Sequence, residues 1–175
     1  KVLLFNNRIY GLTKGQYSPT SEIGKRTKST PYGSVDRPFN PMAVAIGSGA
    51  TFVARSVDVY ATHLKEVLVA AARHKGTAFV EIFQNCNIFN DGAWEPYREK
   101  ELRDDNLLHL RHGEPLIFGK NADKGIRMRG PFVPEVVALS GSVKPSDLVV
   151  HDEKGPGVYA FMLAQMEAPS FPVPV

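Results

Sequence analysis

The sequence predicts an α/β fold in which helices flank a parallel sheet. Residues 2–5 and 78–83 are short apolar runs, as in strands that are buried on both faces of such a sheet. Between them, residues 62–75 carry apolar side chains at helical spacing on one face. The order of strand, helix and strand is typical of a parallel crossover unit, and the prediction of an α/β fold rests on this order.

The first strand is expected to end at Asn6 and Asn7. Residues 11–41 are rich in Gly, Ser, Thr, Pro and Lys without sustained periodicity, which predicts a long irregular segment. Pro41 suits the first turn of a helix, so a short helix is expected at 41–47 and a short strand at 51–54.

The clearest predicted helix covers residues 62–75, and its apolar face consists of Leu64, Val67, Leu68, Ala71 and Ala72. Thr62 is expected to cap its start and Gly76 to close its end. Further on, residues 94–105 are charged and predict an exposed helical stretch. Residues 115–120 and 126–129 predict a hairpin, and 157–167 a helix, whereas the proline-containing tail at 168–175 is not helical.

Composition narrows the class of protein. The 175 residues are 43% hydrophobic and 22% charged, which favours neither a disordered nor a membrane protein. A single cysteine excludes an internal disulfide framework and favours a reducing, cytoplasmic setting. Because the chain opens directly in an apolar strand, we expect it to be a fragment whose fold continues upstream.

Charge is unevenly distributed along the chain. Residues 1–60 carry eight Lys or Arg against three acidic residues, a net charge of +5, while the whole chain carries +3. This basic first third suits a small phosphorylated or carboxylated ligand. Nucleic acid is disfavoured, because the basic residues form no dense stripe interleaved with aromatic side chains.

Polar clusters follow both predicted strands of the sheet. Asn6 and Asn7 come directly after the first strand, and residues 84–87 (Gln-Asn-Cys-Asn) follow the later one. Ligands of open parallel sheets bind beyond the carboxyl ends of the strands, so both clusters are expected to face one crevice.

The first cluster offers groups that suit a metal and an anion. An asparagine side-chain oxygen and a backbone carbonyl two residues on are hard donors for Mg²⁺ held together with phosphates. Gly11 and Gly15 permit close backbone approach, and Lys14 offers an ammonium group to an anion. On spacing alone, an ordinary turn after a strand is the commoner explanation.

Residues 5–21 closely resemble the second half of the thiamin-diphosphate motif in β subunits of 2-oxoacid:ferredoxin oxidoreductases, a motif that begins with Gly-Asp-Gly and ends with Asn-Asn. The resemblance implies that the Asn7 side chain and the Ile9 carbonyl ligate Mg²⁺ and that the Gly-Asp-Gly half lies upstream. It implies a cofactor-binding segment made of Asn6, Asn7, Ile9, Tyr10, Gly11, Leu12 and Thr13.

Two further residues draw their expected roles from this resemblance. Residues 79–91 resemble the family segment whose cysteine is the last ligand of a [4Fe–4S] cluster, which assigns that role to Cys86 and places three thiolates elsewhere. A buried, inert cysteine is the alternative. Lys14 matches the position near the substrate in enzymes that accept 2-oxoglutarate, with a solvated lysine as the alternative. Residues 112–115 (His-Gly-Glu-Pro) are interpreted as a structural turn.

The resemblance thus implies a thiamin-diphosphate-binding fold, present as a C-terminal fragment in residues 1–105, with a C-terminal extension at 106–175 that packs on the same domain and on a partner. The implied reaction converts a 2-oxoacid to acyl-CoA and CO₂, with electrons passing through the cluster to ferredoxin. CoA is the co-substrate, an α subunit is the partner, and a dimer of αβ pairs is expected.

Two alternatives stay open from the sequence. A non-oxidative thiamin-diphosphate decarboxylase or synthase shares the asparagine turn but has no cluster, so iron content separates it. A non-catalytic α/β interaction domain would bind neither thiamin diphosphate nor Mg²⁺.

Overall fold

The computed structural model describes all 175 residues and divides them into two compact units, Lys1–Glu95 and Pro96–Val175. Each unit has a buried apolar cluster of its own. The domain boundary expected between residues 105 and 106 falls within a short helix of the second unit. None of the helices combines the length and the apolar character needed to cross a membrane.

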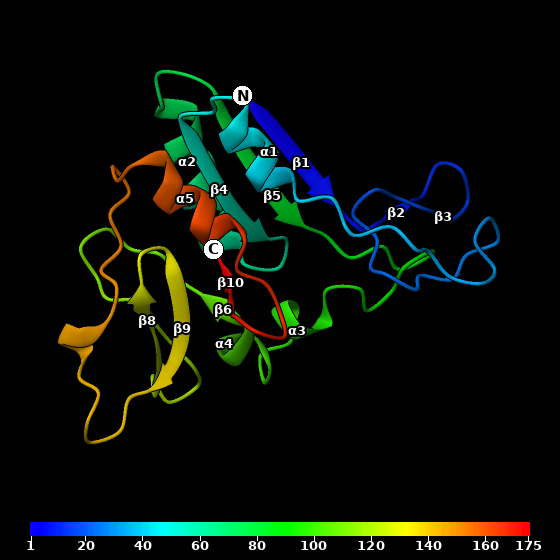
Figure 1. Cartoon of the computed structure of the whole chain (residues 1–175). Coiled ribbons are helices and arrows are strands. Elements are labelled where there is room, and N and C mark those ends of the chain that lie inside the picture. The colour runs from blue at the N-terminus through cyan, green and yellow to red at the C-terminus, as the bar shows by residue number, and fades with distance from the viewer. The chain divides into compact units, whose positions relative to one another are not determined.

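The first unit is built on a three-stranded parallel sheet with the order β1-β5-β4 (Figure 1). These strands are β1 (Val2–Asn6), β4 (Phe52–Val57) and β5 (Ala78–Phe83). The helix α1 (Pro41–Gly47) precedes β4, and α2 (Ala61–Arg73) connects β4 to β5. β2 (Ile9–Tyr10) and β3 (Gln16–Tyr17) form a small antiparallel hairpin after β1. The predicted parallel sheet with a helical crossover is confirmed.

The helix α2 covers the sheet with one apolar face. Leu64, Val67 and Ala71 pack with Val80 and Ile82 of β5 in the core cluster, as the helical spacing predicts. Ala72 is exposed, so the packed face is narrower than expected.

The predicted N-terminal cap of α2 is wrong by two residues. Tyr60 is the capping residue and makes no side-chain capping bond, while Thr62 lies inside the first turn. The cap of α1 is a clearer case, because the Asn40 side chain accepts a hydrogen bond from the Ala43 amide at 3.0 Å.

The strand β1 is present, but its expected burial on both faces is wrong. Val2, Leu3 and Phe5 are 49%, 46% and 55% exposed, because β1 is an edge strand that pairs only with β5. The fully enclosed strand is β5, which pairs with β1 on one side and β4 on the other. An apolar run indicates a strand, but it does not distinguish a central position from an edge.

The second unit contains two small sheets. β7 (Ile117–Phe118), β8 (Lys124–Gly130) and β9 (Val133–Ala138) are antiparallel, and β6 (Leu107–Leu108) pairs in parallel with β10 (Val173–Pro174). Its helices are α4 (Arg103–Asn106), the 3₁₀ turn η1 (Pro145–Asp147) and α5 (Gly157–Ala164). The core consists of Leu108, Leu116, Phe118, Ile126, Met162, Leu163 and Met166.

The prediction for residues 94–105 needs correction, and one strand in the later part of the chain was missed. Residues 94–105 form two four-residue helices, α3 (Glu95–Arg98) and α4, and not one exposed helix. Trp94 and Tyr97 are buried there, at 2% and 6% exposure. The predicted hairpin is confirmed as β7 and β8, but β9 was missed, because Pro134 argues against a strand in the sequence.

Candidate cofactor site

Two successive asparagine turns end β1. The Asn6 Oδ1 atom accepts a hydrogen bond from the Arg8 amide at 3.1 Å, and the Asn7 Oδ1 atom accepts one from the Ile9 amide at 3.2 Å. Between them Arg8 has a φ of 55°, a left-handed conformation that costs energy for a residue with a side chain. Asparagine side chains stabilise such turns by bonding to the backbone two residues on. The Asn-Asn pair therefore sets the path of the chain here.

Asn6 holds this turn from inside the protein. Its side chain is 5% exposed, donates to Glu81 at 2.7 Å and accepts from the Thr20 hydroxyl at 2.7 Å. Its backbone carbonyl accepts from the Trp94 indole at 2.7 Å and from the Gln84 amide at 3.0 Å. Asn6 was expected in the cofactor-binding segment, and its position gives it a supporting role there.

A column of stacked side chains supports the same turn. Trp94 stacks on Phe83 with ring centroids 3.8 Å apart, and the Arg8 guanidinium lies 3.6 Å from the Trp94 ring centroid. The Arg55 guanidinium lies 5.2 Å from the Phe83 ring centroid, and Arg55 forms a buried 2.8 Å ion pair with Glu81. Sequence reasoning missed Trp94 because a run rich in charged residues follows it, although tryptophan is seldom fully exposed.

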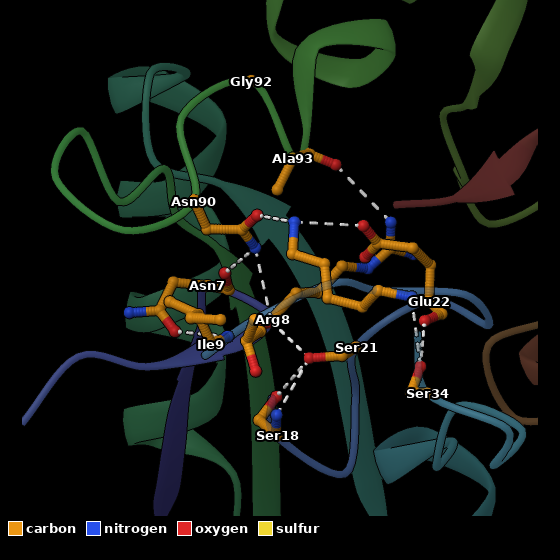
Figure 2. Close-up of polar contacts among 12 residues, drawn as sticks. Asn7, Arg8, Ile9, Ser18, Ser21, Glu22, Ser34, Asn90, Gly92 and Ala93 are labelled. Carbon is orange, nitrogen blue, oxygen red and sulfur yellow. Dashed lines mark hydrogen bonds and ion pairs between the residues drawn. The ribbon is translucent and has the colours of Figure 1, made fainter. Parts of the chain in front are cut away.

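Two loops close over the turn (Figure 2). The Ser21 hydroxyl donates to the Arg8 carbonyl at 2.6 Å. The Asn90 amide donates to the carbonyls of Asn7 at 2.9 Å and Arg8 at 3.3 Å. Lys25 then contacts the Asn90 side-chain oxygen and the Glu22 carboxylate, the latter at 3.2 Å.

The Lys25 contact affects the ionisation of Glu22. Burial raises the pKa of the Glu22 carboxyl, but a backbone hydrogen bond and the charges of Lys25 and Arg8 outweigh burial and lower this pKa below its usual value. Glu22 is therefore ionised near neutral pH and keeps Lys25 over the turn.

Beyond Ile9 the candidate segment forms an exposed tip. Leu12 is 99% exposed, and the Gly15 amide closes the tip by donating to the Tyr10 carbonyl at 3.0 Å. Lys14 is exposed with a φ of 64°, and Gly15 has a φ of 97° beside the Phe89 ring. The Thr13 hydroxyl bonds to the Tyr10 carbonyl at 3.2 Å.

The second polar cluster lies at the same edge of the sheet. Asn6 and Phe83 are paired residues of β1 and β5, so residues 84–87 follow directly beside the asparagine turn, as predicted. Cys86 is half-buried, and its carbonyl accepts a hydrogen bond from the Asn90 amide at 3.0 Å. A cavity of about 530 Å³ lies beside the β2–β3 hairpin, and its wall includes Tyr10, Tyr17 and Arg37.

The donor atoms fit a magnesium ion only in part. The Asn7 carboxamide oxygen keeps a second lone pair beyond its bond to the Ile9 amide, and together with the Ile9 carbonyl it offers two hard donors. No group of three or more His, Cys, Asp or Glu side chains in the chain could hold a metal. Phosphate oxygens, water or groups outside this chain would have to complete the six ligands that Mg²⁺ prefers.

Comparisons with known proteins agree on one family. Residues 1–82 match the family model described as thiamine pyrophosphate enzyme, C-terminal TPP binding domain. The chain is 52% identical over 166 residues to the 2-oxoglutarate oxidoreductase subunit KorB of Mycobacterium tuberculosis. The aligned residues cover 94% of this chain and 44% of that protein. It is 50% identical over 107 residues to a 2-oxoacid:ferredoxin oxidoreductase β subunit of Aeropyrum pernix, covering 59% of this chain and 34% of that protein.

A solved structure supports the same relationship. The chain matches the 2-oxoglutarate:ferredoxin oxidoreductase from Magnetococcus marinus with a TM-score of 0.54 and 36% identity, over 62% of this chain and 36% of that one. That protein was solved with 2-oxoglutarate, coenzyme A and succinyl-CoA bound. The chain thus spans less than half the length of the relatives that it matches.

Proposed function

Because this chain is homologous to the β subunits of 2-oxoacid:ferredoxin oxidoreductases and carries their thiamine-pyrophosphate-binding domain in residues 1–82, we propose that it acts in the β subunit of a 2-oxoglutarate:ferredoxin oxidoreductase. The reaction would convert 2-oxoglutarate and CoA to succinyl-CoA and CO₂, with two electrons passing through a [4Fe–4S] cluster to ferredoxin. The similarity to KorB over nearly the whole chain carries this proposal.

The asparagine turn would serve as part of the cofactor site. In this proposal the Asn7 carboxamide and the Ile9 carbonyl hold Mg²⁺, and residues 10–13 border the diphosphate of thiamin diphosphate. When bound, this cofactor supplies the carbanion that attacks the keto carbon of the substrate. The chain's own contribution is to fix two oxygen donors, which the hydrogen bonds of Asn6 and Asn7 support.

Lys14 would select the substrate. It is exposed at the tip that follows the asparagine turn and makes no ion pair within the chain. An ammonium group there would attract the second carboxylate of 2-oxoglutarate, which pyruvate lacks. The names of two relatives support 2-oxoglutarate as the substrate class.

Cys86 would be one of four cluster ligands, with the other three thiolates outside this chain. The proposal also includes an α subunit that completes the site, a dimer of αβ pairs, and a cytoplasmic location. The single, half-buried cysteine, three residues after the end of β5, is compatible with such a shared cluster site.

The test uses the whole protein with its partner subunit. Lys14→Ala is expected to lower kcat/KM for 2-oxoglutarate about ten- to a hundredfold, the value of a hydrogen bond to a charged group, and to leave pyruvate turnover nearly unchanged. Lys28→Ala is the matched control, because Lys28 is also an exposed lysine of the basic segment.

Equal losses on both substrates would remove the assignment of Lys14. A whole protein that is indifferent to thiamin diphosphate and contains no iron would overturn the proposed function itself. Dependence on thiamin diphosphate without iron would point to a non-oxidative enzyme.

A further inference from the structure

We infer that Asn90 is a positioning residue that holds the Asn7 carboxamide oxygen in the direction of the proposed metal, an inference that rests on the proposed function. The motif at residues 6–9 does not contain Asn90, which lies 83 positions after Asn7 in the sequence. Its side chain nevertheless reaches the turn from the loop that follows β5, as Figure 2 shows.

The argument begins with one peptide plane. The peptide between Arg8 and Ile9 presents its carbonyl to the Asn90 amide at 3.3 Å and to the Ser21 hydroxyl at 2.6 Å. The N–H of the same peptide donates to the Asn7 Oδ1 atom at 3.2 Å. Fixing the carbonyl end of this plane therefore fixes the direction of the N–H that holds the Asn7 carboxamide.

The preceding peptide plane is held by the same side chain. The Asn7 carbonyl accepts from the Asn90 amide at 2.9 Å. Arg8 lies between the two bonded carbonyls in a left-handed conformation, with a φ of 55°. Such a residue persists only where its surroundings hold it, and Asn90 supplies two of the bonds that do so.

The orientation of the Asn90 amide is itself determined. Asn90 is 5% exposed, and its oxygen faces the Lys25 ammonium, so its NH₂ group must face the two carbonyls. Lys25 is held in turn by Glu22 at 3.2 Å. The Asn90 backbone amide donates to the Cys86 carbonyl at 3.0 Å, so one residue joins the turn that carries Cys86 to the proposed metal turn.

The Asn90→Asp substitution tests whether Asn90 positions the turn through its hydrogen bonds or only fills space in the packing. The aspartate keeps the size of the side chain and an oxygen for Lys25, but it replaces the NH₂ donor with an oxygen that repels the two carbonyls. We expect the Mg²⁺ concentration for half-maximal thiamin diphosphate binding to rise about ten- to a hundredfold, as when residues behind metal ligands are changed. Isothermal titration calorimetry of the whole protein with its partner subunit measures this.

Asn121→Asp is the matched control, because it makes the same chemical change at an exposed position outside the asparagine turn and outside the polar cluster at residues 84–87. Its Mg²⁺ requirement is expected to equal that of the wild type. A purely structural role for Asn90 would lower the melting temperature of the metal-free protein and leave the Mg²⁺ requirement unchanged, and that result overturns the inference.

Lys25→Met provides a second test of the inference if the Asn90→Asp variant does not fold. It leaves the Asn90 amide in place and removes the group that orients it, so a several-fold rise in the Mg²⁺ requirement is expected. An unchanged Mg²⁺ requirement in this variant would count against the inference. A wild-type protein that binds neither thiamin diphosphate nor Mg²⁺ overturns the proposed function, whereas normal wild-type binding with unaffected variants overturns only the role of Asn90.

Discussion

The two adjacent asparagines that end β1 have different roles. Asn6 is buried and bonded to Glu81 and Thr20, so it fixes the turn from within. Asn7 is half-buried and directs its oxygen toward the Ile9 amide, so it is the asparagine with an oxygen near the surface. Identical residue types at neighbouring positions thus separate into a buried supporting residue and a proposed metal ligand, because successive side chains leave a strand on opposite faces.

Trp94 is expected to contribute to the stability of the first unit. Trp94→Phe removes the indole bond to the Asn6 carbonyl and weakens the stacking with Arg8. We expect the free energy of unfolding to fall by about 1–3 kcal/mol, the sum of a hydrogen bond and a cation–π contact. Urea denaturation followed by circular dichroism measures it. Tyr32→Leu, at a position that is 97% exposed, should change stability by less than about 0.5 kcal/mol, and equal losses in both variants would contradict the role of Trp94.

His151 is expected to make the second unit sensitive to acid. Burial lowers the pKa of the His151 imidazole, with a smaller lowering from His112 set against the raising effects of Glu153 and Asp152. The unfolded chain therefore binds the proton first as pH falls. The stabilising contribution is fully present above about pH 6.5, the ordinary histidine pKa, and is lost as pH falls through the lowered folded pKa.

His151→Gln should therefore flatten the decline of the unfolding free energy between about pH 7 and 5, measured by urea titration at each pH. His112→Gln, at a side chain that is 51% exposed, should retain most of the wild-type decline, because burial and not His112 is the main cause of the lowered His151 pKa. A wild-type slope in the His151 variant would show that other groups cause the acid sensitivity.

At the scale of elements, some helices and strands could be predicted from local sequence patterns, whereas others form only because of tertiary contacts. The helices α1 and α2 and the strand β5 follow from residue spacing, because the backbone periods of 3.6 and 2 place side chains on faces irrespective of distant neighbours. The strand β9 contains an exposed Val136 and a proline at position 134, so its own residues do not predict a strand. It is a strand because it pairs with β8.

The strand β8 provides a matched pair of glycines for a packing test. A Cβ at Gly125 would lie 2.4 Å from a Leu148 methyl and 3.2 Å from the Leu116 carbonyl, whereas one at Gly130 meets nothing within 4 Å. Gly125→Ala is expected to lower the free energy of unfolding by about 1–3 kcal/mol through overpacking. Gly130→Ala should change it by less than about 0.5 kcal/mol. Thermal and urea melts of the two variants decide the matter, and equal stability would show that Leu148 can move aside.

At the scale of the whole molecule, the two units have different characters. Lys1–Glu95 carries the parallel sheet, the asparagine turn and Cys86, so all residues of the proposed site fall within it. Pro96–Val175 is built from antiparallel and two-residue strands around a separate apolar core. The basic excess in residues 1–60 falls in the first unit, where anionic ligands are proposed to bind.

The sequence by itself determined the fold class, the main helix, the strand β5 and the place of the asparagine turn at the carboxyl edge of the sheet. Each of these depends on residues close together in the chain. Only the tertiary structure decided that β1 is an edge strand, that Trp94 is buried and that Asn90 reaches the turn. These features join residues more than 70 positions apart, and the periodicity of a single segment contains no information about which distant segment will pack against it.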